Sequence, residues 1–128
     1  MSEKDPLFYL NAISQTIFDK KGSNILALDI REISSLTDFV IIAEGNIEKH
    51  VVAIAQAVIE RLQQLGKPPI FIEGIKTGDW IVIDDLHIMV HLFIPGLRDK
   101  YQLEQLWREG HIIDLHIDVS PKNVLYRT

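Results

Sequence analysis

Residues 79–94 have the sequence DWIVIDDLHIMVHLFI, which is two apolar runs joined by a short polar link. The runs 80–83 and 88–94 are rich in isoleucine and valine, residue types that favour strands. The link contains Asp84 and Asp85, and an acidic pair between two such runs is typical of a turn. The stretch therefore predicts an antiparallel β-hairpin.

The second strand of this hairpin has two different faces, because successive side chains of a strand point in opposite directions. One face is wholly apolar and predicts core: Ile88, Val90, Leu92 and Ile94. The other face mixes polar and apolar side chains, namely His87, Met89, His91 and Phe93, beside Trp80, Val82 and Asp84 of the first strand. Two interpretations stay open for it. A helix covers it, or it is an exposed patch for a partner, since Trp and Met are enriched in protein interfaces.

The rest of the chain alternates between helical and strand patterns. Helices are expected from Asp5-Pro6 towards Gly22, from a cap at Asn46 to Gly66, and over 98–107. Further strands are expected over 25–30, 39–43 and 70–72. The strand–helix–strand order of 39–72 predicts a right-handed crossover between parallel strands. We expect an α/β fold, with one mixed five-stranded sheet and flanking helices.

Length and charge limit the class of protein. The 128 residues fit one domain, expected over 1–108, with a C-terminal tail over 109–128. Lys+Arg number 13 and Asp+Glu 18, giving a net charge of -5. The chain therefore lacks the excess of basic residues that is typical of proteins that bind nucleic acid directly. The segment 73–85 carries four acids and one lysine, Lys76, and so favours a basic partner surface.

The length of the apolar segments and the character of residues 1–6 predict where the protein is located. No apolar stretch approaches the ~20 residues that span a bilayer, so no membrane partner is expected. Residues 1–6 are polar and acidic, unlike a signal or transit peptide. A cytoplasmic protein is expected.

Catalytic and metal-binding patterns are weak throughout. The chain has no cysteine, which excludes disulfides and thiol chemistry. His87 and His91 lie roughly 13 Å apart on a strand, too far for one metal ion. In the tail, His111, Asp114 and His116 are interpreted as solvated. We therefore expect no catalytic residues, no metal and no cofactor.

Several short motifs in order resemble one known family. They are Ser35-x-Thr37-Asp38-Phe39, Gly45, His50-Val51 at the start of a helix, Glu73-Gly74, Asp79-Trp80-Ile81-Val82-Ile83-Asp84, Val90-His91 and Tyr101-x-Leu103-Glu104-x-Leu106-Trp107. In combination they resemble the ribosomal silencing factor family, also called Iojap, from the first helix to Trp107. The family usually has Thr-Gly-Thr-Ser where this chain has Glu44-Gly45-Asn46-Ile47, and Gly-Asp where it has Leu86-His87.

The resemblance implies a fold related to nucleotidyltransferases but without their active site. It also implies docking on the large ribosomal subunit through ribosomal protein uL-fourteen, steric blocking of small-subunit joining, and a homodimer when free. The alternatives are a ribosome assembly factor at the same site and a nucleotidyl-transfer enzyme. The latter needs a Gly-Ser turn followed by two aspartates one residue apart, whereas Gly22-Ser23 is followed only by Asp29.

The expected partner-binding residues lie on the mixed face of the hairpin and on the last helix. On that helix, Tyr101 lies roughly 200° from Leu103, which suits the core together with Leu106 and Trp107. Trp80 and Tyr101 are the expected anchors, because buried aromatic side chains supply much of the energy of an interface. The full set is Asp79, Trp80, Asp84, Met89, His91 and Tyr101.

Overall fold

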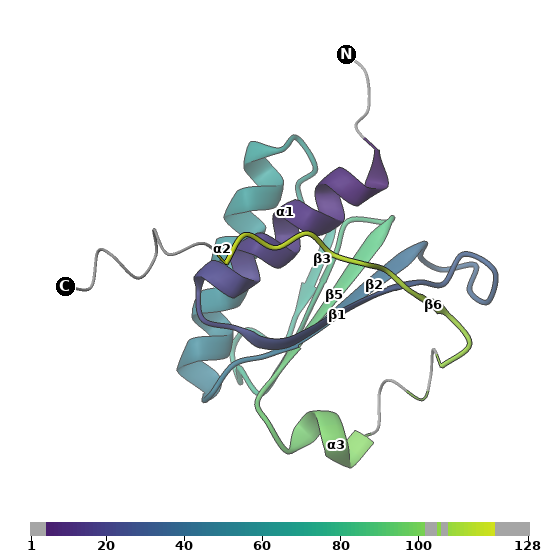
Figure 1. The fold of residues 1–128 in the computed structure, drawn as a ribbon. Helices are drawn as coiled ribbons and strands as arrows, with labels where there is room; N and C mark the ends of the chain where they lie inside the picture. The colour runs from purple at the N-terminus through teal and green to yellow at the C-terminus, as the bar shows by residue number, and fades with distance from the viewer. Residues whose placement is uncertain (1–4, 102–104, 106–107, 120–128) are drawn as a thin grey trace.

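The fold is a single mixed sheet with helices on both faces (Figure 1). A computed structural model of the chain describes residues 5–101, 105 and 108–119. The elements are α1 (Pro6–Asp19), β1 (Ser23–Asp29), β2 (Phe39–Glu44), α2 (Glu48–Gln64), β3 (Phe71–Glu73), β4 (Trp80–Asp84), β5 (Ile88–Phe93), α3 (Leu97–Tyr101) and β6 (His111–Ile112). The strand order is β3-β4-β5-β2-β1-β6. The predicted α/β architecture is confirmed, with six strands in place of five.

The centre of the sheet is a parallel pair, β2 and β5. Their register runs from Phe39 opposite Ile88 to Glu44 opposite Phe93. Strands that are covered on both faces need apolar residues at successive positions, and Phe39 to Ala43 are all buried. Each central strand has an antiparallel neighbour, since β1 pairs with β2 and β4 pairs with β5. The predicted β4–β5 hairpin is therefore confirmed.

The predicted crossover from β2 to β3 joins strands that are not neighbours in the sheet, so the predicted position of β3 is wrong. The two strands run in the same direction, but β5 and β4 lie between them, and β3 pairs antiparallel with β4. The physical reason is apolar content. Strand β5 has apolar residues on both faces and takes the covered position, whereas all three residues of β3 are exposed and β3 occupies the edge.

Two hydrophobic clusters lie on opposite sides of the sheet. The larger cluster packs α1 and α2 against it. Helical spacing predicts an apolar stripe on α2 of six residues, of which five are buried in this cluster, namely Val51, Ile54, Ala55, Val58 and Leu62, whereas Leu65 is the C-cap and lies outside it. The smaller cluster contains Leu28, Ile30, Val40, Ile42 and Phe93, with Leu97 of α3 packed on it. The mixed face of the hairpin is therefore partly covered by a helix. No helix among the described residues is long and apolar enough to cross a membrane.

The N-cap of helix α2 lies one residue later than predicted, and the helix begins at Glu48. Its N-cap is Ile47, which makes no side-chain capping bond, so the prediction of Asn46 as the cap is wrong. The backbone N–H of Asn46 instead donates to Nδ1 of His50 at 2.8 Å. Because that nitrogen accepts, the ring proton lies on Nε2, which donates to the Lys20 carbonyl at 2.7 Å. His50 thus joins the start of α2 to the end of α1.

The C-terminal segment covers the edge of β1. Strand β6 pairs with β1, and the N–H of Ile113 donates to the Ala27 carbonyl at 2.9 Å. Beyond it, Asp118 and Gln15 exchange two hydrogen bonds of 2.6 and 3.1 Å, and the segment crosses α1 (Figure 1). The described part of the predicted tail therefore packs on the main fold.

Helix α3 is held by a buried arginine. Arg98 donates to the Asn24 carbonyl at 2.6 Å and to the Glu44 carboxylate at 3.1 Å. Five of the ten residues of the helix predicted over 98–107 are described, and 98–101 lie in α3, whereas 102–104, 106 and 107 lie outside the described residues. Glu44 is one of the departures from the family pattern, and here it fixes α3 to the end of the central strands.

The β4–β5 turn contains a strained residue. Leu86 has a φ of 87°, in the left-handed region that favours glycine, and its side chain is 58% exposed. The resemblance to the ribosomal silencing factor family implies glycine at this position, which suits that backbone geometry.

Replacing Leu86 with glycine should therefore stabilise the protein. Relief of the left-handed strain, about 1–2 kcal/mol, should exceed the backbone entropy cost of glycine, about 0.5–1 kcal/mol. Thermal unfolding should show Leu86→Gly melting roughly 2–4 °C above the parent. The matched variant Leu86→Ala keeps the Cβ atom and the strain, so it should melt near the parent. Equal melting of the two variants would contradict the strain at this position.

Candidate partner-binding face

Three aromatic side chains on β4 and β5 form the centre of the candidate site. The Trp80 ring lies 5.4 Å from that of Phe93 and 6.1 Å from that of His91, and the His91 and Phe93 rings are stacked at 6.0 Å. The antiparallel register places Trp80 opposite Phe93 and puts His91 on the same face. We call Trp80, His91 and Phe93 the aromatic cluster. The aromatic cluster lies between the part of the mixed face that α3 covers and the part that is exposed.

A hydrogen bond fixes the indole of Trp80. Its Nε1–H donates to Nδ1 of His91 at 3.1 Å, and an indole has no other donor. The neutral His91 ring therefore carries its proton on Nε2. This bond limits the rotation of Trp80, so the half-buried indole keeps one orientation on the surface.

Burial keeps His91 neutral. The residue is 6% exposed, and desolvation lowers the pKa of its imidazole to about 4. The sequence predicted His91 as a partner-binding residue, and the structure places its ring beneath the surface. Its effect on a partner would therefore act through Trp80.

Gly74 packs directly against the backbone of Trp80. Its φ is 92°, and a Cβ atom at this position would lie 2.0 Å from the Trp80 carbonyl oxygen. Only glycine permits so close an approach. This contact accounts physically for the Glu73-Gly74 motif, since the preceding loop must pass directly against the start of β4.

The open half of the face extends from Trp80 towards the sheet edge. Val82, Asp84 and Met89 are partly exposed there, and Phe71 lies opposite Asp84 on β3. Phe71 is 48% exposed and was not predicted from sequence. Alternation on β3 would have found it only if the β3–β4 register had been known.

The acids around this face differ in their roles. Asp84 and Asp85 accept backbone N–H groups of the turn, from Leu86 at 2.8 Å and from Ile88 at 2.8 Å. The Asp79 carbonyl accepts from the backbone N–H of Ile94 at 3.0 Å, which continues the β4–β5 pairing, and strand alternation places the Asp79 side chain on the face opposite to that of Trp80. The carboxylates thus shape the turn and also make the rim negative. No group of three or more potential metal ligands is found in the described parts of the chain.

The Thr37-Asp38-Phe39 motif joins the start of β2 to the β4–β5 hairpin by hydrogen bonds. The carbonyl of His87 accepts from the Thr37 hydroxyl at 3.0 Å and from the backbone N–H groups of Asp38 and Phe39 at 3.1 and 3.0 Å. The His87 ring also contacts the Asp38 carboxylate at 3.2 Å. The motif therefore sets the register of the central parallel pair.

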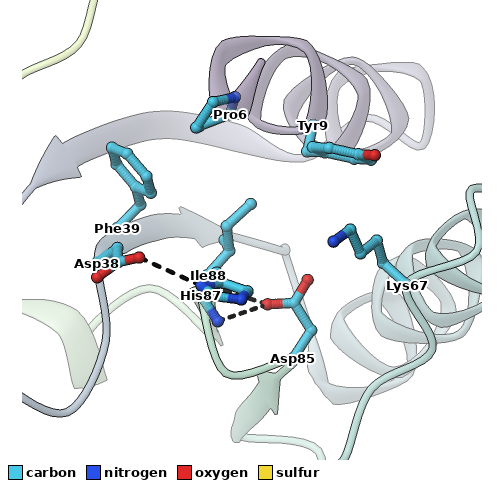
Figure 2. Close-up of a pocket in the computed structure, with 8 residues that line it drawn as sticks. All are labelled: Pro6, Tyr9, Asp38, Phe39, Lys67, Asp85, His87 and Ile88. Atoms are coloured by element: carbon cyan, nitrogen blue, oxygen red, sulfur yellow. Dashed lines mark hydrogen bonds and ion pairs between the residues drawn. The ribbon is translucent and has the colours of Figure 1, made fainter. Parts of the chain in front are cut away.

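A small cavity lies beside this fastening (Figure 2). It measures about 100 Å³ and is lined by residues that include Tyr9, Asp38, Lys67, Asp85 and His87. The Lys67 ammonium lies 5.3 Å from the centre of the Tyr9 ring. Cavities that enclose drug-sized ligands measure roughly 300–1,000 Å³, so this one is too small for such a ligand.

The structure brings four of the six predicted partner-binding residues together on this face, namely Trp80, Asp84, Met89 and His91. Asp79, Trp80 and Asp84 lie on or beside β4, and Met89 and His91 lie on β5. Tyr101 is the last residue of α3, and its side chain lies outside the described residues. Together these residues define a small α/β protein with a half-open sheet face that is aromatic at its centre and acidic at its rim.

The chain belongs to the ribosomal silencing factor family. The family model described as "Ribosomal silencing factor during starvation" matches residues 4–125. The ribosomal silencing factor of Bacillus subtilis is 35% identical over 102 residues, which is 80% of this chain and 86% of that protein. A crystal structure from Chromobacterium violaceum has a TM-score of 0.79 and 27% identity, covering 91% of this chain and 97% of that one. A mouse protein named "Mitochondrial assembly of ribosomal large subunit protein 1" is 24% identical over 103 residues, covering 78% of this chain and 45% of that protein.

The lowered pKa of His91 predicts a loss of stability in acid. The unfolded chain binds a proton at His91 below about pH 6.5, whereas the folded protein binds it only near pH 4. The free energy of unfolding should therefore fall as the pH drops between these values, by about 2 kcal/mol from His91 alone at pH 5. Urea unfolding at pH 7.5 and pH 5 measures this.

The variant His91→Asn keeps an acceptor near the position of Nδ1 but cannot titrate, so its loss between the two pH values should be smaller by that amount. His116→Gln removes an exposed histidine and should change the loss little. An unchanged loss in His91→Asn would mean that His91 is not the group responsible.

Proposed function

We propose that this protein is a cytoplasmic ribosomal silencing factor that acts by binding and not by catalysis. Its partner is the large ribosomal subunit, contacted through ribosomal protein uL-fourteen, and the bound factor blocks joining of the small subunit sterically. The observation that carries the proposal is the half-open face around Trp80. Membership of the silencing factor family supports it.

The composition of the face suits a protein partner. Trp80 offers a large apolar area, and its orientation is fixed in advance by His91. A side chain that is already held in place loses less conformational entropy on binding, which improves affinity. Met89 and Val82 lie next to it on the sheet, and Tyr101 is a further proposed anchor on α3. The acids Asp79 and Asp84 favour a basic partner surface.

Steric blocking requires no chemistry from the chain. A factor that occupies the surface where two subunits meet excludes one of them by volume alone. A nucleotidyl-transfer mechanism finds little support, since Gly22 and Ser23 are followed on β1 by Asp29 and not by two aspartates one residue apart. The β1 carboxylate, Asp29, is paired with Arg31 at 2.7 Å, and these hydrogen bonds hold the pKa of Asp29 below its ordinary value.

A second candidate function is ribosome assembly at the same site. The name of the mouse relative favours it, since that protein is named for assembly of the ribosomal large subunit. Both functions need the same binding face. They differ in whether the bound subunit is mature, and this difference can be tested. A homodimer of the free protein is also proposed.

Sedimentation of ribosomes tests the proposed function. The protein should comigrate with isolated large subunits, and adding it to separated subunits should reduce the fraction of joined ribosomes. Trp80→Ala should weaken binding at least ~30-fold, because an aromatic anchor contributes ~2 kcal/mol or more. Tyr101→Ala should weaken it similarly.

Phe8→Ala is the matched control, because Phe8 is an exposed aromatic residue on α1, which packs on the opposite face of the sheet. It should bind like the parent. Thermal unfolding of each variant separates loss of binding from loss of fold. Comigration with small subunits, or undisturbed subunit joining at saturation, would contradict silencing. Comigration with immature large subunits alone would favour assembly.

Salt should slow association with the partner. The segment from Glu73 to Asp85 is acidic, and attraction between exposed charges is screened at higher ionic strength. The association rate constant with purified uL-fourteen should fall roughly threefold or more between low and physiological salt, with a smaller change in dissociation. Asp79→Asn should reduce this dependence, whereas Glu60→Gln on the exposed side of α2 should leave it unchanged. A rate constant indifferent to salt would argue against an acidic docking surface.

A further inference from the structure

Strand β3 is an uncovered apolar edge of the sheet. It lies at the end of the strand order and, among the described strands, pairs only with β4. Ile70, Phe71 and Ile72 are 61%, 48% and 40% exposed. Natural proteins usually protect such edges with charges, proline, bulges or a covering segment, because an open edge pairs with other chains.

The other end of the sheet is built differently, because a two-residue strand, β6, covers the edge of β1. Strand β6 pairs with β1, and the chain continues from Ile113 to Asp118 along α1. The chain thus covers one edge with its own C-terminal segment and leaves the other open. The two ends of the sheet therefore differ in what they expose, and the β3 end presents three adjacent apolar side chains, Ile70, Phe71 and Ile72.

The side chains of β3 point to both faces of the sheet. Phe71 pairs with Asp84 and lies on the side of the aromatic cluster, whereas Ile72 pairs with the buried Ile83 and lies on the side covered by α1 and α2. A strand placed beside β3 would find an apolar neighbour on each of its faces. A partner that lay only on the open face would contact Phe71 and leave Ile72 exposed.

The charge of the edge determines what kind of strand it fits. Glu73 lies on β3, Asp84 lies opposite Phe71, and Asp85 follows in the turn. A second copy of this chain would bring the same acids and a net charge of -5 to the contact, and like charges opposed across strands are unfavourable. A basic segment would complement them.

We propose that β3 is a strand-addition site, at which an extended basic segment of a partner protein pairs with the open edge and prolongs the sheet. The main-chain hydrogen bonds of such pairing give affinity, and side chains on alternate positions give specificity. This inference rests on the proposed function, because it places the added strand next to Trp80 on the same binding face.

Hydrogen–deuterium exchange of the full chain, free and bound to isolated large ribosomal subunits, tests the proposal. Amides of 71–73 should exchange at least about tenfold more slowly in the bound protein, because strand pairing protects them. Ile72→Thr keeps a β-branched side chain but removes apolar contact, and should weaken binding about two- to fivefold. Ile112→Thr is the matched control at the covered edge, where Ile112 is 75% exposed, and should bind like the parent.

The alternatives give different results. Protection confined to β4 and β5, with Ile72→Thr binding normally, would overturn strand addition and leave the proposed function intact. Protection of β3 in the free protein that grows with its concentration would assign the edge to a second copy and overturn the basic partner. Absence of comigration with large subunits would overturn the proposed function and this inference together.

Discussion

The parallel pairing of β2 with β5 is the constraint on which the other elements depend. It joins two antiparallel units, β1–β2 and β4–β5, that are distant in sequence. The carbonyl of His87 fixes its beginning through Thr37, Asp38 and Phe39, and the N–H of Gly45 donates to the Phe93 carbonyl at 2.9 Å at its end. With this register set, α2 leaves towards one face and α3 towards the other (Figure 1).

A second register, that of β4 against β5, builds the aromatic cluster. Because β4 lies antiparallel to β5, Trp80 meets both His91 and Phe93, and the close approach of Gly74 holds the start of β4 from behind. The imidazole is too buried to offer charge near neutral pH, so it acts as a neutral acceptor. The Trp80 indole is held in one orientation, and its only hydrogen-bond donor is already bonded to His91. The exposed part of the ring therefore suits an apolar contact, with acidic side chains around it.

The two edges of the sheet differ in how far the rest of the chain covers them. One is closed by the C-terminal segment, and the other carries exposed isoleucine and phenylalanine beside the proposed docking face. The buried ion pair of Arg98 with Glu44, at 3.1 Å, holds α3 over the half of the mixed face that lies near β1 and β2. On this face of the sheet, the exposed part lies on the side of β3 and β4, where Phe71 is 48% exposed. In the proposed function, this part receives the partner.

The sequence by itself determined the hairpin, the helices and the face of Trp80, because hydrophobic periodicity and turn residues act over a few positions. It also determined the family, through motifs whose roles are local, such as Gly74 against Trp80. Only the tertiary structure decided that β4 and β5 lie between β2 and β3, that Ile47 and not Asn46 is the N-cap of α2, and that the segment 111–118 covers the edge of β1. It also decided that His91 is buried and that Phe71 joins the site. These features depend on which surfaces compete for the same neighbours in three dimensions, and pairing between segments distant in sequence leaves no periodic pattern in the chain.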